Sequence, residues 1–274
     1  MFEKCRAWFR TKQNPSYARR QPLILINGLA EQAESWYANV DAWRQHFDVH
    51  TPNLLAYEGA ALHRRIEEKK QIDVDFLVEQ LRLYLDEFVQ TPPYHLVANS
   101  LGGKIAVEFS ARYPDQVARL VLLCPSGLSN EERLPIVEGV RRNDLKSVID
   151  SVFHNARHAD NRLLNYYQRQ FSNRRWRAGL MRTIRGTMDH RVRDKLTQVT
   201  QPTLLVVGRE DRIVDPRQVI EAAGLLPHGR LLVLQHCGHA PQIERSREIN
   251  RLVVNFLTEA PVTQGAIAAS KEIA

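Results

Sequence analysis

The chain carries the stretch Val97-Ala98-Asn99-Ser100-Leu101-Gly102-Gly103, in which an apolar strand pattern runs directly into a helical pattern with one serine between them. A serine at such a sharp turn needs small neighbours, because its own backbone is strained and the flanking segments approach each other closely. Ala98 and Gly102 meet this need, with alanine standing where the G-x-S-x-G pattern has its first glycine. The stretch therefore predicts that the Ser100 hydroxyl lies at a helix N-terminus, where amide N–H groups favour a developing anion. Taken alone, the serine could equally well be a cap of this helix.

Outward from this turn, short apolar segments typical of buried strands alternate with segments of helical periodicity. The predicted strands cover residues 23–26, 47–52, 94–98, 117–123, 203–207 and 231–234. The predicted helices cover residues 32–46, 73–89, 102–113 and 243–256, and Asp215-Pro216 begins another with an N-cap and a first-turn proline. This alternation predicts an α/β fold class, with a mostly parallel, doubly wound sheet and helices on both faces.

The alternation is interrupted by residues 128–198, which show helical periodicity, many arginines and no convincing strand. An insertion between two strands of a parallel sheet lies above its carboxyl edge, where α/β sheets bind ligands. We therefore predict a helical cap over residues 128–198, with a core made of residues 21–127 and 199–258. A basic N-terminal segment, 1–20, and an alanine-rich flexible tail, 259–274, complete the predicted organisation. An insertion that only adds packing is the alternative.

A serine nucleophile needs a base, and the base needs an acid that orients it. Residues of both kinds follow predicted strands: Gly208-Arg209-Glu210-Asp211 comes after one strand and Cys237-Gly238-His239 after the last one. Glu210 competes with Asp211 for the acidic role, whereas Asp215 is better explained as a helix cap. Each of these residues alone is a weak signal. A serine, an acid and a histidine that each follow a predicted strand together predict a catalytic site.

These residues occur in the order Ser100, Asp211, His239, and from residue 21 to residue 257 the chain resembles the α/β-hydrolase fold family. The phrase Arg112-Tyr113-Pro114-Asp115-Gln116-Val117-Ala118-Arg119-Leu120-Val121-Leu122 is typical of that family after the nucleophile helix. The resemblance implies that Ser100 is the nucleophile, His239 the base and Asp211 the orienting acid. It also implies an oxyanion hole made by the backbone N–H groups of Leu29 and Leu101. The candidates for contact with the substrate are Asn27, Gly28, Asn99 and Ala240.

Three features depart from the family pattern. Asn27 replaces the usual histidine of the oxyanion loop, and residues 53–59 replace the usual Asp-x-x-Gly-x-Gly stretch. Only about 20 residues precede the first strand, which leaves little room for the family's first antiparallel hairpin. We therefore expect six strands rather than eight.

The predicted chemistry is acyl transfer, in which Ser100 attacks a carbonyl group and water releases the acyl-enzyme. We expect a carboxylic ester as the small-molecule substrate and no cofactor. Residues 99–103, 239–244 and 250–253 resemble the C–C bond hydrolases of aromatic ring-cleavage pathways, although Ala240 stands where those enzymes typically have tryptophan. Hydrolysis of a C–C bond, hydrolysis of a thioester, and a non-catalytic binding module on the same fold are the alternatives.

The net charge of +7 is concentrated in two segments. Residues 129–200 hold 15 Lys+Arg against 8 Asp+Glu, and residues 1–20 hold six against one. Two solvated basic surfaces would explain this, as would attraction of an anionic substrate or partner. We hypothesise that one or two cap arginines bind an anionic group of the substrate. The candidates are Arg141, Arg142, Arg174, Arg175, Arg177, Arg182 and Arg185.

Several classes of protein are not expected. No apolar run reaches the ~18 residues that cross a bilayer, and the first 20 residues lack the pattern of a secretory signal. The three cysteines are odd in number and widely spaced, which favours a reducing, cytoplasmic location. His236 and His239 flank Cys237 without a second pair of ligands, so no metal site is predicted. Nucleic-acid binding is not expected, peripheral membrane contact through residues 1–20 is an alternative, and the oligomeric state is left open.

Overall fold

The computed structural model describes residues 20–31, 33–54, 60–129, 135–142 and 144–260. Within these ranges, six parallel strands form one sheet, in the order β2-β1-β3-β4-β5-β6. The strands are β1 (Pro22–Ile26), β2 (Asp48–His50), β3 (Tyr94–Asn99), β4 (Val117–Leu123), β5 (Thr203–Gly208) and β6 (Gly229–Leu234). The prediction of a parallel α/β sheet with six strands is confirmed.

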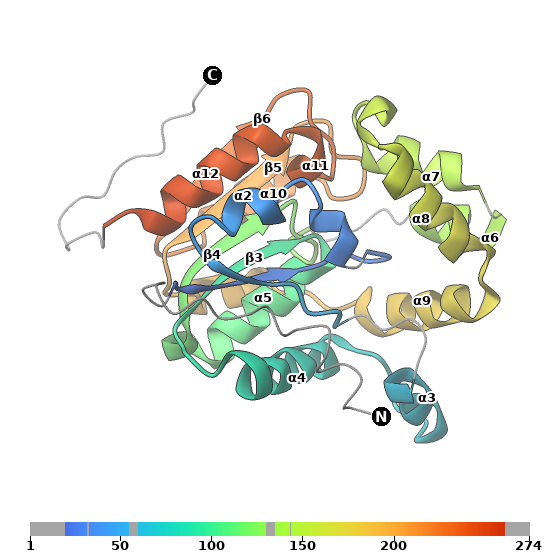
Figure 1. The fold of residues 1–274 in the computed structure, drawn as a ribbon, viewed down its shortest axis with the longest axis horizontal. Helices are drawn as coiled ribbons and strands as arrows, with labels where there is room; N and C mark the ends of the chain where they lie inside the picture. Colours follow the sequence, from blue (N-terminus) through green and yellow to red (C-terminus); the bar gives the residue numbers. More distant parts are fainter. Residues whose placement is uncertain (1–19, 32, 55–59, 130–134, 143, 261–274) are drawn as a thin grey trace.

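Both faces of the sheet are buried, because successive residues of a strand point to opposite sides. In β1, Leu23 and Leu25 face one layer of helices, and Ile24 and Ile26 face the other. The first layer consists of η1 (Ala33–Trp36), α2 (Val40–Trp43) and α12 (Ser246–Thr258). The second contains α4 (Val74–Tyr84), η2 (Leu85–Val89), α5 (Leu101–Arg112) and α10 (Pro216–Ala223). Figure 1 shows α2 and α12 on one side of the sheet and α4 and α5 on the other.

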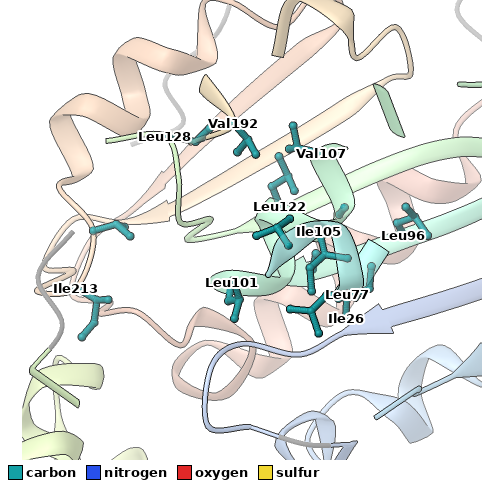
Figure 2. Close-up of a cluster of buried hydrophobic side chains, with 14 of the residues drawn as sticks. Ile26, Leu77, Leu96, Leu101, Ile105, Val107, Leu122, Leu128, Val192 and Ile213 are labelled. Carbon is teal, nitrogen blue, oxygen red and sulfur yellow. The ribbon is translucent and has the colours of Figure 1, made fainter. Parts of the chain in front are cut away.

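The second layer packs around α5, the helix that begins after Ser100. Figure 2 shows Ile105 of α5 among the buried side chains of Ile26, Leu96 and Leu122, which belong to strands β1, β3 and β4. Gly102 allows this close approach, since a Cβ atom at that position would lie 2.4 Å from the Ile26 carbonyl oxygen. The small residue expected two positions after the serine is therefore required by the contact between α5 and β1.

The first layer differs from the prediction of one helix over residues 32–46. Trp36 and Trp43 belong to two short helical turns, η1 and α2, and both pack in the cluster that includes α12. Asn39 lies between them with a backbone φ of −123°, and its Nδ2 donates hydrogen bonds to Gln242 O and Asn250 Oδ1. These buried polar contacts end one turn and begin the next, and a periodicity of apolar residues does not reveal them.

The remaining helix boundaries follow mostly from local signals. Asp73 accepts a hydrogen bond from the Phe76 N–H and Asp215 one from the Arg217 N–H, so both act as N-caps, at α4 and α10. The helix predicted over residues 243–256 is divided into α11 (Pro241–Glu244) and α12, with Arg245 outside helical geometry between them. The sequence analysis did not predict α3 (Ala60–Glu67) or the turn η3 (Pro114–Gln116).

Between β4 and β5, the described residues form helices and no strand. These are α6 (Pro135–Arg142), α7 (Leu145–Val152), η4 (Ala156–His158), α8 (Asn161–Ser172), α9 (Arg174–Thr187) and η5 (Arg193–Gln198). Figure 1 shows α6, α7, α8 and α9 together at one end of the sheet. The helical character of the insertion is as expected. Its last helical turn, η5, packs against α5 of the core, so the boundaries of the cap at residues 128 and 198 stay a prediction.

The ends of the chain are described only in part. Glu259, the first residue of the predicted tail, forms ion pairs with Arg119 and Arg230. Residues 261–274, residues 1–19 and most of the unusual stretch 53–59 lie outside the described residues. Within the described ranges, no helix combines the length and the hydropathy needed to span a bilayer.

His95 in β3 makes the stability of the fold dependent on pH. Its ring packs edge-on against Phe47, and burial, with the nearby Arg119 charge, lowers its pKa from 6.5 to about 4. Because the folded pKa lies below the unfolded one, the stabilisation is present above pH 6.5 and is lost as the pH falls toward 4, by about 3 kcal/mol in total. His95→Phe keeps an apolar ring and should lose less stability than the wild type between pH 8 and pH 4.5 in urea unfolding. Equal losses in the two proteins would contradict this assignment.

Candidate active site

Ser100 stands at the turn between β3 and α5, in a strained backbone conformation with φ 52° and ψ −120°. Its N–H donates a hydrogen bond to Leu123 O of the neighbouring strand, and its carbonyl accepts from the Gly103 and Ser126 N–H groups. These bonds on both sides hold a positive φ that costs a non-glycine residue about 1 kcal/mol or more. The strain expected at this serine is therefore observed, and the turn presents the hydroxyl at the first turn of α5.

The side chains of Ser100, His239 and Asp211 form a continuous hydrogen-bonded line. His239 Nε2 lies 2.8 Å from Ser100 Oγ, and His239 Nδ1 lies 2.7 Å from Asp211 Oδ2. All three residues are buried, and the Asp211 carboxylate has no exposed surface. An ionised Asp211 accepts the Nδ1–H proton, which leaves Nε2 of a neutral imidazole free to accept the proton of the serine hydroxyl.

The Asp211 carboxylate is itself held by backbone groups. Its Oδ1 accepts hydrogen bonds from the N–H groups of Ile213 and Val214, at 2.8 and 3.1 Å. The competing acid, Glu210, instead accepts a hydrogen bond from the Cys237 N–H through its Oε2, at 2.9 Å. Of the two acids that follow β5, Asp211 is therefore the one that the structure places against His239.

The loop that carries His239 is tied to the helical insertion. The His239 N–H donates to Val152 O at the end of α7, at 2.8 Å. Glu244, which is buried, accepts the Gly238 N–H on Oε1 and the His154 N–H on Oε2, at 2.8 and 2.9 Å. Burial raises the pKa of Glu244, and these amide bonds partly oppose that effect. Glu244 thus joins the histidine loop to the insertion. The sequence did not indicate this role, because Glu244 and His154 are 90 positions apart along the chain.

Two cavities meet at Ser100. The larger is lined by Gly28, Leu29, Glu31, Asn99, Ser100, Val148, Ile149, Val152, Phe153, Leu163, Tyr167, Ile213, His239 and Ile243. The smaller is lined by Leu29, Ser100, Leu101, Lys104, Ser126, Ile184, Thr187, Met188 and Ile213. Helices α7 and α8 supply much of the apolar wall of the larger cavity, so the insertion takes part in forming the site.

The two residues expected to form the oxyanion hole both lie in these walls. Leu29 follows Gly28 just after β1, and it lines both cavities with Ser100. Leu101 lines the smaller cavity and begins α5, so its N–H belongs to the first turn, where no intrahelical acceptor exists. The N–H of Gly28 is used differently, since it donates to Glu31 Oε2 at 3.2 Å.

Of the four residues considered for contact with the substrate, Gly28 and Asn99 lie in the wall of the larger cavity. Asn99 also donates hydrogen bonds through Nδ2 to Leu123 O and His239 O, which fixes the histidine loop against the turn at Ser100. Asn27 and Ala240 line neither of these two cavities, so their contact with the substrate stays a prediction. Asn27 Oδ1 accepts the indole N–H of Trp36 at 2.6 Å, and Ala240 is buried at the start of α11.

The hypothesis about the cap arginines is not supported by the walls of these two cavities. None of the seven candidates lines either cavity among the described residues, and six of them are exposed. Two other charged side chains lie there instead. Glu31 faces the larger cavity, and Lys104 faces the smaller one, with its Nζ donating to Thr187 O at 3.0 Å. Neither residue belongs to a motif, so the sequence alone did not indicate them.

Cys124 Sγ lies near Asp211 and His239, with one ligand atom of each within 4.8 Å of the others. A metal would need the thiolate form, whereas burial raises the pKa of the Cys124 thiol and favours its neutral form. Both nitrogens of His239 are already within hydrogen-bond distance of Ser100 or Asp211. Cys124 therefore fits a buried residue that packs beside Asp211 and His239 better than a metal ligand.

Comparisons with known proteins agree with this fold. The model of the alpha/beta hydrolase fold family matches residues 21–246. Monoacylglycerol lipase abhd6-B of Xenopus laevis is 20% identical over 267 residues, which cover 88% of this chain and 76% of that protein.

Among solved structures, the meta-cleavage product hydrolase CumD of Pseudomonas fluorescens has a TM-score of 0.74 at 21% identity, covering 86% of this chain and 90% of CumD. The carboxylesterase CesB of Bacillus subtilis has a TM-score of 0.71 at 20% identity, covering 88% of this chain and 85% of CesB. The family model spans most of the chain and includes the turn at Ser100. The chain belongs to the alpha/beta hydrolase fold family.

Proposed function

We propose that this protein is a serine hydrolase that cleaves a carboxylic ester through an acyl-enzyme. The observation that carries the proposal is the line of hydrogen bonds from Ser100 Oγ through His239 to Asp211, at 2.8 and 2.7 Å, at the wall of a mostly apolar cavity. A hydroxyl, an imidazole and a carboxylate in this arrangement are the parts that nucleophilic acyl transfer needs.

In the first half of the reaction, Ser100 Oγ attacks the ester carbonyl while His239 Nε2 takes the hydroxyl proton. Asp211 stabilises the imidazolium and holds its ring in position. The oxyanion of the tetrahedral intermediate accepts hydrogen bonds from the N–H groups of Leu29 and Leu101, each worth roughly 2.7–4 kcal/mol in the transition state. His239 then donates its proton to the leaving alcohol, and the acyl group stays on Ser100.

In the second half, water attacks the acyl-enzyme. His239 takes a proton from the water, the same two amides stabilise the second oxyanion, and the acid leaves as Ser100 regains its proton. These steps use the residues of this chain alone. The alternation of His239 between base and acid requires a ring held by Asp211 on one side and free to reach the substrate on the other.

The nature of the cavity supports a neutral, largely apolar substrate. Val148, Ile149, Phe153, Leu163 and Ile243 supply aliphatic and aromatic surface that suits an acyl chain. One of the chain's relatives is a monoacylglycerol lipase, and hydrolysis of an acyl ester by that protein supports the same reaction here.

Hydrolysis of a C–C bond in a ring-cleavage product is the second candidate, since the sequence of the loop after His239 resembles such enzymes. Products of catechol ring cleavage are carboxylates, and the larger cavity has the Glu31 carboxyl in its wall and no cap arginine among its described residues. A carboxylate on the substrate would have to leave water for this mostly apolar wall without an arginine partner among the described lining residues, which favours the ester over this alternative.

The proposal predicts a burst of p-nitrophenol when the purified protein meets p-nitrophenyl esters of increasing chain length, followed by slower turnover. A fluorophosphonate should abolish this activity and leave one adduct per chain, which peptide mass spectrometry should place on Ser100. An adduct elsewhere, or full activity after labelling, would contradict the proposal. A ring-cleavage dienoate that is hydrolysed faster than every ester would favour the second candidate.

A further inference from the structure

The proposed mechanism leaves one carboxyl group of the larger cavity without a role. Glu31 follows the oxyanion loop by sequence, is 8% exposed, and lines the cavity together with Ser100 and His239. The rest of that wall is mostly aliphatic or aromatic among the described residues. Burying a carboxyl group there costs free energy, so its presence calls for a polar partner.

The position of Glu31 relative to the nucleophile follows from the contacts around Gly28. The point where a Cβ atom on Gly28 would stand lies 3.2 Å from Glu31 Oε2, 3.2 Å from Ser100 Cβ and 3.0 Å from Asn99 Oδ1. The carboxyl group, the nucleophilic residue and Asn99 therefore lie close around one point beside Gly28, where a side chain on residue 28 would be crowded.

Within the protein, Glu31 has a partner for part of its hydrogen-bonding capacity. Its Oε2 accepts the Gly28 N–H at 3.2 Å, which fixes the loop just before Leu29. The Ser35 side chain is a second polar neighbour of the carboxyl group. Because a carboxylate offers about four acceptor positions, these two neighbours leave capacity for a group on the substrate. The carboxyl thus serves two purposes: it positions the loop, and it presents a polar atom to whatever fills the cavity.

The chemistry of the matching group follows from the surroundings. Burial raises the pKa of Glu31, while the Gly28 amide and the charge of His239 oppose that effect. A hydroxyl group can pair with the carboxyl in either protonation state, as a donor to the carboxylate or as an acceptor from the acid. An ammonium or a carboxylate group would have to leave water for a mostly apolar wall, and a carboxylate would in addition meet a like charge whenever Glu31 is ionised.

We propose that Glu31 determines the substrate class of this site, by accepting a hydrogen bond from a hydroxyl group on the ester and by disfavouring esters that carry a carboxylate. The inference rests on the proposed ester hydrolysis and narrows it to hydroxyl-bearing esters. Glu31 acts in binding and in positioning the Gly28 amide, and it takes no part in proton transfer.

The test uses three p-nitrophenyl esters whose acyl chains have equal length and end in methyl, hydroxyl or carboxylate. A second set varies the alcohol half of the ester in the same way, because the hydroxyl can belong to either half. In the wild type, we expect the hydroxyl ester to exceed the methyl ester in kcat/KM by about tenfold, and the carboxylate ester to fall below it by at least as much. The readout is the ratio within each protein, which does not depend on its active fraction.

Two variants separate the two effects of Glu31. Glu31→Gln keeps a carbonyl oxygen for the Gly28 amide and removes the charge, so the penalty on the carboxylate ester should shrink by about tenfold. Glu31→Met removes both polar oxygens at similar size, so the preference for the hydroxyl ester should disappear as well. Glu34→Gln is the matched control, because Glu34 is exposed three residues further on and should leave both ratios unchanged. If Glu31→Met does not fold, the Glu31→Gln ratio still decides the matter.

The proposal is overturned if the ratios in the Glu31 variants equal those of the wild type, or if the wild type prefers the methyl or carboxylate ester. A second readout needs no turnover. Calorimetry measures the binding of amides with the same acyl chains to the Ser100→Ala variant and to the double variant that also carries Glu31→Gln. If no ester is hydrolysed but the binding ratios behave as described, the proposed function fails and the role of Glu31 stands. If esters are hydrolysed but neither readout responds to Glu31, the proposed function stands and the role of Glu31 fails.

Discussion

Replacing Ser100 by alanine should lower kcat for ester hydrolysis by up to about 10⁶-fold and leave a small residual rate. The loss follows because the nucleophilic oxygen is gone, while the amides of Leu29 and Leu101 and the cavity still favour attack by water on the bound ester. That residual contribution can be about 10³- to 10⁴-fold over the uncatalysed reaction. Steady-state kinetics with the best p-nitrophenyl ester of the series measures the effect.

The matched control for this change is Ser110→Ala. Ser110 lies on the same helix, is completely buried, and its hydroxyl has no hydrogen-bond partner within the described residues. Its removal should change neither kcat nor the unfolding midpoint by much, because no bond is lost. Ser100→Ala keeps a residue with a Cβ atom at φ 52°, so thermal unfolding shows whether the turn is intact. A Ser100→Ala protein that is folded and keeps most of its activity would disprove the assignment of the nucleophile.

Replacing Asp211 by asparagine should lower kcat by about 10⁴-fold with a much smaller change in KM. The asparagine carbonyl can still accept the N–H groups of Ile213 and Val214, so its amide NH₂ then faces His239 Nδ1. That amide donates, which forces the imidazole into the tautomer with its proton on Nε2. The ring can then no longer accept the proton of Ser100, although its position is almost unchanged.

Asp215→Asn is the control for this prediction, since it makes the same chemical change four positions further on. Asp215 caps α10 through the Arg217 N–H, and asparagine caps helices about as well as aspartate. Activity and stability should both stay close to those of the wild type. If Asp211→Asn were as active as Asp215→Asn, another acid would have to orient His239, and Glu210→Gln would be the next variant to measure.

Much of the fold, and the residues of the hydrogen-bonded line from Ser100 to Asp211, could be anticipated from local patterns. Apolar runs bounded by turn residues predicted each strand, and small residues on both sides of Ser100 predicted its strained turn. The same holds for Asp215, whose type and position before a proline predict an N-cap. These features depend on neighbours in the sequence, which is why the sequence contains enough information to find them.

Other parts depended on contacts between distant segments. The break in the helix predicted over residues 32–46 comes from Asn39, whose partners lie more than 200 positions away in α11 and α12. Asn27 and Ala240 lie next to Gly28 and His239 in the sequence, yet neither lines the two cavities. Asn27 accepts a hydrogen bond from Trp36, and Ala240 is buried at the start of α11. A motif specifies a residue's neighbours along the chain, and it does not specify which surface its side chain faces.

By itself, the sequence determined the parallel α/β sheet and the order of a serine, an acid and a histidine just past three strands. Short-range sterics and the period of apolar residues specify these, because each signal spans only a few positions. Only the tertiary structure decided that Asp211 rather than Glu210 meets His239, and that Glu31 and Lys104 rather than cap arginines line the cavities at Ser100. The physical reason is that folding brings together side chains that are far apart in the sequence. Which charged groups line a cavity therefore depends on the packing of the whole molecule.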